Sequence, residues 1–122
     1  MPTELYENLE APKKAVLAAV DTGEYDVETS LEELRELAKT AGYPVVGTAT
    51  QKLQSPAAAT FMGSGRLLEL KEYLEAVEAD LIIFDEELSP AQLRNIDGLK
   101  MGALGAAIET LDQMHQKTGH VT

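Results

Sequence analysis

A glycine-rich turn is the first place in this sequence where residue types and spacing could do chemistry. Gly63, Ser64, Gly65 and Arg66 stand directly before a stretch with apolar residues at helical spacing. Backbone N–H groups at the start of a helix can face an anion, and an arginine would add a cation. These four residues are a candidate contact for an anion or a partner. The alternative is that the two glycines only form a tight turn that leads into the helix. The chain has neither the P-loop pattern nor the dinucleotide pattern G-x-G-x-x-G.

Two aspartates, Asp21 and Asp85, form a second candidate site. Each follows an apolar run that is typical of a strand. The carboxyl ends of parallel strands meet at one edge of a sheet, where open α/β folds bind ligands. In response-regulator receivers, acids at this edge hold Mg²⁺ and accept phosphate. A receiver needs a second acid beside the first, however, and here Thr22 follows Asp21. The simpler interpretation is that Asp85 starts a solvated acidic loop with Glu86 and Glu87, whose charge favours the next helix N-terminus.

The sequence predicts neither a metal site nor a catalytic residue. His115 and His120 are five residues apart, so they do not have the i,i+4 spacing of two ligands on one helix face. No HExxH motif surrounds them, and we expect both to be exposed to solvent. The chain has no cysteine, which excludes disulfides and thiolate metal sites.

The elements that must position these residues alternate along the chain. Short apolar runs predict buried strands, and apolar residues at helical spacing predict amphipathic helices. This order predicts an α/β fold with three layers: a parallel sheet of three to four strands, right-handed crossovers, and helices on both faces. The predicted strands are Lys14–Val20, Val45–Thr50 and Leu81–Phe84, and the predicted helices are Ser30–Ala41, Arg66–Val77 and one that begins at Pro90.

Two helices carry recognisable capping patterns. Ser30 and Glu33 have the spacing of a capping box, and Gly42 stands where a glycine would end that helix. Ser89 and Gln92 have the same spacing around Pro90, which suits the first position of a helix. We therefore expect both helices to begin at these serines.

The chain is predicted to contain one domain. Residues 1–12 have little periodicity and are expected to form a loose arm, 13–96 the α/β domain, and 97–122 a divergent tail. In the tail, Lys100–Leu104 could form a short strand. A helix is predicted from the spacing of Leu104, Ile108, Leu111 and Met114, ending near Gly119.

The net charge of −11 argues against avid binding to nucleic acid. Ten basic residues are scattered among twenty-one acidic ones, whereas phosphate binding needs clustered lysine and arginine. No apolar run approaches the ~20 residues of a membrane span, and the acidic first residues do not resemble a signal peptide. These features suit a cytoplasmic protein without a membrane partner.

Several segments between about 13 and 96 resemble, in order and spacing, the N-terminal domain of the HflX family of ribosome-associated GTPases. The tail departs from the family because it lacks an Asp-Arg-Thr run. The resembling segments are Ser30-Leu-Glu-Glu-Leu, Ala38-Lys-Thr-Ala-Gly, Val45-Val-Gly, Thr50-Gln, Thr60-Phe-Met-Gly-Ser-Gly-Arg-Leu-Leu-Glu-Leu and Ala79–Ile96.

The resemblance implies a non-catalytic accessory domain. In the family, this domain packs beside a GTPase domain, helps regulate it, and joins a helical hairpin that contacts the large ribosomal subunit. GTP and Mg²⁺ would belong to a GTPase domain beyond residue 122, so no cofactor is expected here, and the chain alone is expected to bind ribosomes weakly or not at all. Two alternatives remain open: a stand-alone domain that binds a small ligand or phosphate at Gly63–Arg66, and a receiver-like phosphoacceptor.

Overall fold

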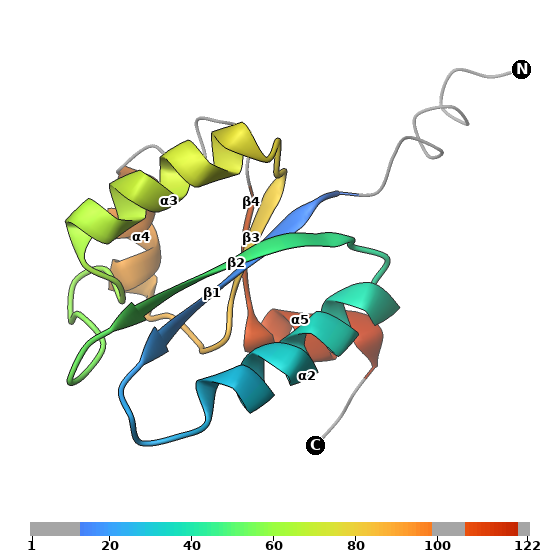
Figure 1. Cartoon of the computed structure of the whole chain (residues 1–122), viewed down its shortest axis with the longest axis horizontal. Helices are drawn as coiled ribbons and strands as arrows, with labels where there is room; N and C mark the ends of the chain where they lie inside the picture. Colours follow the sequence, from blue (N-terminus) through green and yellow to red (C-terminus); the bar gives the residue numbers. More distant parts are fainter. Residues whose placement is uncertain (1–12, 99–106, 120–122) are drawn as a thin grey trace, which may run out of the picture.

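Strands and helices alternate along the chain, and the strands form one parallel sheet (Figure 1). The structure is a computed structural model that describes residues 13–98 and 107–119. The four strands lie in the order β2-β1-β3-β4. In chain order the elements are β1 Ala15–Asp21, α2 Val27–Thr40, β2 Val45–Lys52, α3 Ser64–Ala76, β3 Leu81–Phe84, α4 Pro90–Gly98, β4 Ala107–Thr110 and α5 Leu111–Thr118.

The helices cover both faces of the sheet, as the alternating order predicts (Figure 1). On one face, α3 and α4 contribute Leu67, Leu70, Leu74 and Ile96 to a buried cluster with the sheet. On the other face, leucines of α2 pack with Met114 of α5. The three-layer α/β fold expected from the sequence is therefore confirmed.

The two central strands are buried on both sides. Successive residues of β1 alternate between the two clusters: Val16 and Ala18 point toward α3, and Leu17 and Ala19 toward α2. All four residues of β3 are buried. The unbroken apolar runs at these positions correctly predicted strands that are covered on both faces.

The second strand is less buried than its sequence suggested. We expected Val45 and Val46 to be buried like the central strands, but Val45 is only half-buried and 36% of Val46 is exposed. The reason is that β2 lies at the end of the strand order, so β1 is its neighbour on one side only.

The first helix begins earlier than its capping pattern suggested. Asp26 is the N-cap, and its side chain accepts hydrogen bonds from the N–H groups of Glu28 and Thr29. The predicted capping box at Ser30 is therefore wrong, because Ser30 lies inside the helix. The second prediction is confirmed: Ser89 and Gln92 exchange the two hydrogen bonds of a capping box at the start of α4.

The described part of the tail completes the domain. β4 pairs in parallel with β3, and Met114 of α5 is buried against α2. The predicted start of the tail helix is wrong, because Ile108 lies in β4 and α5 begins at Leu111. The predicted end of this helix near Gly119 is confirmed, because Gly119 is the C-cap of α5 and has a positive φ. The predicted arm at 1–12, the strand Lys100–Leu104 and His120 lie outside the described residues.

Candidate functional site

Asp85 lies at the carboxyl end of β3 in a buried polar cluster. Only 3% of its surface is exposed. Its Oδ2 accepts hydrogen bonds from the Tyr25 hydroxyl at 3.1 Å and from the Ser30 hydroxyl at 3.1 Å. Its Oδ1 is buried and has no hydrogen-bond partner among the described residues. The expected solvated loop is therefore wrong for Asp85, although Glu86 and Glu87 are exposed.

Burial governs the ionisation of this cluster. Loss of hydration raises the pKa of Asp85 above its usual range, while the hydrogen bonds from Tyr25 and Ser30 offset part of the rise. Burial also raises the pKa of Tyr25, and the negative charge of Asp85 adds to that effect. Tyr25 therefore stays a neutral hydrogen-bond donor, and its single hydroxyl proton is shared between Asp85 Oδ2 at 3.1 Å and the carbonyl of Val20 at 2.8 Å.

Asp21 reaches the same edge of the sheet but has a different environment. It ends β1, and its Oδ1 accepts a hydrogen bond from the N–H of Gly23. It contributes to the raised pKa of Tyr25, so both carboxylates influence this tyrosine. A cavity of about 420 Å³ beside Asp21 is also lined by Lys52 and Leu53, but not by Asp85. The structure thus brings both aspartates to one edge, and the cavity beside Asp21 does not extend to Asp85.

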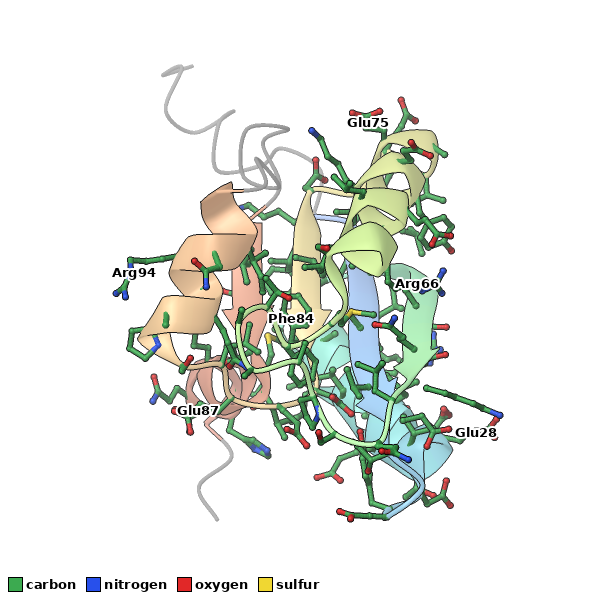
Figure 2. The ribbon with its side chains drawn as sticks, turned by 90° about the vertical axis from the view of Figure 1, so that its left-hand side faces the viewer. Glu28, Arg66, Glu75, Phe84, Glu87 and Arg94 are labelled. Atoms are coloured by element: carbon green, nitrogen blue, oxygen red, sulfur yellow. The ribbon has the colours of Figure 1, made fainter. Side chains whose placement is uncertain are left out.

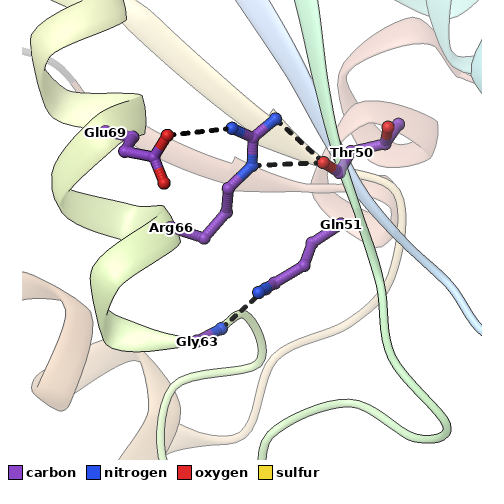
Figure 3. A network of polar contacts seen from close by, with 5 residues as sticks. All are labelled: Thr50, Gln51, Gly63, Arg66 and Glu69. Atoms are coloured by element: carbon purple, nitrogen blue, oxygen red, sulfur yellow. Dashed lines mark hydrogen bonds and ion pairs between the residues drawn. The ribbon is translucent and has the colours of Figure 1, made fainter.

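The glycine-rich turn is tied to β2 (Figure 3). The N–H of Gly63 donates to the side-chain oxygen of Gln51 at 2.8 Å. The Arg66 guanidinium donates twice to the carbonyl of Thr50, at 2.9 and 3.2 Å, and lies 3.5 Å from a carboxylate oxygen of Glu69. An anion that used the Gly63 N–H or the Arg66 guanidinium would compete with these contacts.

The loop between β2 and α3 is held by a neighbouring helix. Gln92 and Asn95 of α4 donate side-chain hydrogen bonds to the carbonyls of Ala57 and Ala59. Phe61, at the end of this loop, has a positive φ of 68° and packs edge-on against Phe84. The loop is therefore fixed against the sheet by polar contacts and by one buried aromatic ring.

The described residues show neither a metal-binding cluster nor a membrane-spanning helix. Within the described ranges, no three histidine, aspartate or glutamate side chains converge in a group that could hold a metal ion. Nor does any described helix combine the length and apolar character of a membrane span. His115 is half-buried on α5 rather than fully exposed as expected.

Sequence reasoning found Asp85 but missed the partners that bury it. Tyr25 and Ser30 are 60 and 55 residues away from it in the chain, and no local pattern links them. It also missed Gln51 as the partner of Gly63, 12 residues away. In each case the contact arises because parallel strands bring segments that are distant in the chain to the same edge of the sheet.

Comparisons with known proteins agree with this architecture. The family model described as "GTP-binding GTPase N-terminal" matches residues 28–102. The chain is 43% identical over 97 residues to the GTPase HflX of Lacrimispora saccharolytica, which covers 79% of this chain and 23% of that protein. It is 42% identical over 96 residues to the GTPase HflX of Caldanaerobacter subterraneus, covering 79% and 21%. It is 32% identical over 96 residues to the GTPase HflX of Escherichia coli, and the match covers 78% of this chain and 22% of that protein.

Solved structures show the same fold. A crystal structure of an SsGBP variant superposes with a TM-score of 0.63 at 20% identity and covers 87% of this chain and 31% of that one. The C-terminal catalytic domain of an IS607-like serine recombinase superposes with a TM-score of 0.60 at 22% identity, covering 85% and 73%. At such identities these likenesses concern the fold alone.

The assignment rests on the family model and on the sequence relatives. The family model spans more than half of the chain, and these three curated relatives share one name, GTPase HflX. The chain spans only about a quarter or less of the length of these relatives. It belongs to the GTP-binding GTPase N-terminal family and is an HflX-type N-terminal domain.

Proposed function

We propose that this chain is a non-catalytic accessory domain of a ribosome-associated GTP-binding protein, and that it acts through contacts with a GTPase domain of the same polypeptide. The observation that carries the proposal is the family match over residues 28–102. GTP and Mg²⁺ would be held by the GTPase domain, and this domain would pack beside it and regulate its activity. The protein would work in the cytoplasm, where ribosomes are found.

The contacts at the carboxyl edge of the sheet support a role in binding rather than catalysis. Asp85 is enclosed by Tyr25 and Ser30, and the Arg66 guanidinium is held by Thr50 and Glu69. A catalytic group must reach a substrate, and these groups are committed to contacts within the domain. Their arrangement stabilises loops, which suits a rigid module that presents its surface to another domain.

The charge of the chain limits what it can do at the ribosome by itself. Its net charge of −11 would meet a surface that is rich in RNA phosphate. Electrostatic repulsion would then oppose the encounter over about 8 Å at physiological salt. We infer that ribosome association depends on other parts of the full-length protein.

Replacement of the matching domain in a relative tests the regulatory role. In the HflX GTPase of Lacrimispora saccharolytica, the segment that matches this chain would be deleted or exchanged for it, and GTP hydrolysis would be measured. Deletion should change the rate of hydrolysis, and the exchange should restore it. Equal rates for the intact and deleted proteins would contradict a regulatory role.

Two measurements on the isolated chain test the remaining parts. Calorimetry should detect no submicromolar, guanine-selective binding of GTP, because the P-loop and its lysine are missing from the sequence. Purified large subunits should not pellet the chain appreciably at physiological salt. Stoichiometric pelleting that persists at raised salt would show that the domain has its own ribosome-binding surface.

A further inference from the structure

The outer edge of β2 has no strand partner among the residues that the structure describes. β2 is the longest strand of the sheet and lies at its end (Figure 2). Its first seven residues, Val45–Gln51, carry no charged side chain. Proteins usually protect such an edge with charges, prolines or bulges, because unpaired N–H and C=O groups attract another strand. The register with β1 shifts once, where Ala15 and Val16 face Val45 and Gly47, and is regular from there on. The uncharged edge from Gly47 to Gln51 is therefore a template for strand addition.

The hydrogen bonds identify which residues face outward. In a parallel pair, every second residue directs both its N–H and its C=O toward the neighbouring strand. The N–H of Leu53 donates to the carbonyl of Asp21 in β1, whereas the carbonyl of Thr50 is bound by Arg66. The residues that alternate with Leu53, namely Thr48, Thr50 and Lys52, therefore point their backbone groups away from β1.

A groove runs beside this edge. Its volume is about 630 Å³, and it lies between Thr48 and Ala49 of β2 and the neighbouring helix α3. Leu70, Tyr73 and Ala76 supply apolar surface, and the charged side chains are Arg66, Glu69 and Glu72. A strand that paired with β2 would place one row of side chains against this groove, since successive side chains alternate between the two faces.

Charge selects among the possible occupants. Glu69 is paired with Arg66, but Glu72 forms no ion pair with any described residue. A second copy of this chain would bring the same acidic helix and another net charge of −11 to the edge. A basic segment would instead be attracted by both the groove and the whole domain.

We propose that the edge of β2 binds an extended, lysine- or arginine-bearing polypeptide segment by strand addition. The segment pairs with the outward backbone groups of Thr48 and Thr50 and places a basic side chain near Glu72. Main-chain hydrogen bonds supply affinity, and the groove supplies selectivity. This inference does not depend on regulation of a GTPase, so either can fail alone.

Arg66 has a defined role in this arrangement. Its guanidinium occupies the carbonyl of Thr50, which is one of the outward acceptors (Figure 3). It therefore limits how far an added strand can pair, and its charge opposes a basic segment. Removal of the guanidinium should strengthen binding of the segment, whereas an anion-binding role of Arg66 predicts no such gain.

The test uses the full 122-residue chain, labelled with ¹⁵N, and a short peptide of alternating lysine and valine. NMR titration should shift the amide signals of Thr48 and Thr50, and hydrogen exchange at these amides should slow. The control is the same peptide with N-methyl groups on alternate residues, which keeps its charge but removes the donors needed for pairing. With the control peptide, the amide chemical shifts and the hydrogen-exchange rates of Thr48 and Thr50 should stay as they are in the chain without peptide.

Three variants locate the site. Glu72→Lys should weaken binding by about fivefold or more, which corresponds to roughly 1 kcal/mol. Glu75→Lys makes the same charge change on the same helix outside the groove, and should change affinity by less than about twofold. Arg66→Ala should tighten binding by about two- to fivefold, on the order of one hydrogen bond and one repulsive charge.

Several results would overturn the proposal. Equal binding of the N-methylated peptide would show charge attraction without pairing. Shifts confined to another face, or no shifts at millimolar peptide, would exclude this edge as the site. A dimer of the unliganded chain in sedimentation, abolished by Thr48→Pro, would assign the edge to a second copy of the chain.

Discussion

β1 has a neighbour on each side, and the two neighbours differ in what covers them. β3 lies between β1 and β4, and every residue of Leu81–Phe84 is buried. β2 has β1 on one side only, and among its residues Ala49 alone is buried. Both strands are parallel to β1; the ladder with β3 is regular, and the ladder with β2 shifts register once, between Ala15 and Val16. Position in the sheet, more than pairing, thus decides how much of a strand is hidden.

The central strands and the edge strand have different roles in the domain. The central strands hold two buried clusters together, so their side chains determine stability. The edge strand contributes less to the core and leaves backbone groups and a groove accessible. A domain that acts through contacts needs both, because a rigid centre keeps the exposed edge in a fixed shape.

The largest difference in the free energy of unfolding should come from placing an aspartate in β3 and, separately, in β2. Ile83→Asp puts a carboxylate where the native side chain is completely buried, and should cost several kcal/mol, on the order of the whole stability of a small domain. Val46→Asp, at a position that is 36% exposed, should cost less than about 1 kcal/mol. Urea unfolding measures both, and equal midpoints for the two variants would contradict the comparison.

A glycine of β2 shows where the edge strand is nevertheless tightly packed. A Cβ at Gly47 would overlap the hydroxyl of Tyr73 on α3. Gly47→Ala should therefore destabilise the domain by about 1–3 kcal/mol through overpacking. Tyr73→Phe removes the hydroxyl and should recover part of this loss in the double variant.

The matched control for that prediction is Gly65→Ala. A Cβ at Gly65 meets nothing within 4 Å, and the residue lies in α3. Alanine should be neutral or stabilising there by up to about 1 kcal/mol, because it favours the helix. If both alanines had the same effect on the urea midpoint, contact with Tyr73 would not explain the glycine at position 47.

The same comparison shows how far the sequence could predict the fold. Four bulky apolar residues in succession, Leu81–Phe84, correctly predicted a strand buried on both faces. After Val45 and Val46, however, β2 continues with small and polar residues such as Gly47 and Thr48, which suits an edge. That signal was present, but strand order depends on contacts across the sheet that no local pattern encodes.

The candidate site was less predictable than the fold. The start of α2 was predicted at Ser30, whereas Asp26 caps the helix four residues earlier. Val27, which continues the apolar stripe toward Leu31, was a signal for the earlier start. The burial of Asp85 could not be foreseen in this way. It results from Tyr25, which reaches Asp85 from a loop 60 residues away.

The buried acid at the end of β3 should respond to pH through its hydrogen bonds. The folded-state pKa of Asp85 is raised, so its contribution to stability is complete below about pH 4 and is lost as pH rises through the raised pKa. Tyr25→Phe removes a bond that favours the carboxylate. It should cost about 1–3 kcal/mol at neutral pH, and less below pH 4, where the carboxyl is protonated.

A double variant tests this explanation of the pH dependence. Asp85→Asn keeps the size of the side chain but cannot ionise. In its presence, the cost of Tyr25→Phe should vary little between acidic and neutral pH in urea titrations. An unchanged pH dependence in the Asp85→Asn background would assign it to groups other than Asp85.

The smallest expected effect concerns an exposed acid, Asp26, which contrasts with buried Asp85. Hydrogen bonds from the side chain and N–H of Thr29 lower the pKa of Asp26 in the folded state. Its contribution is therefore present above about pH 4 and is lost as pH falls through the lowered pKa. Asp26→Ala should lower the urea midpoint at neutral pH by less than Tyr25→Phe does. The effect of Asp26→Ala on the midpoint should become smaller in acid, where Asp26 is protonated.

Two further variants distinguish capping by Asp26 from the interaction of Ser30 with Asp85. Asp26→Asn should keep part of the cap but lose its pH dependence, because the amide oxygen still accepts from the N–H groups of Glu28 and Thr29 and does not ionise, whereas the amide nitrogen cannot accept from the Thr29 hydroxyl. Ser30→Ala removes a donor to Asp85, so its effect should set in at the higher pH where Asp85 ionises. If the cost of Ser30→Ala did not vary with pH, the ionisation of Asp85 would not explain it, because a serine hydroxyl does not itself ionise in this range.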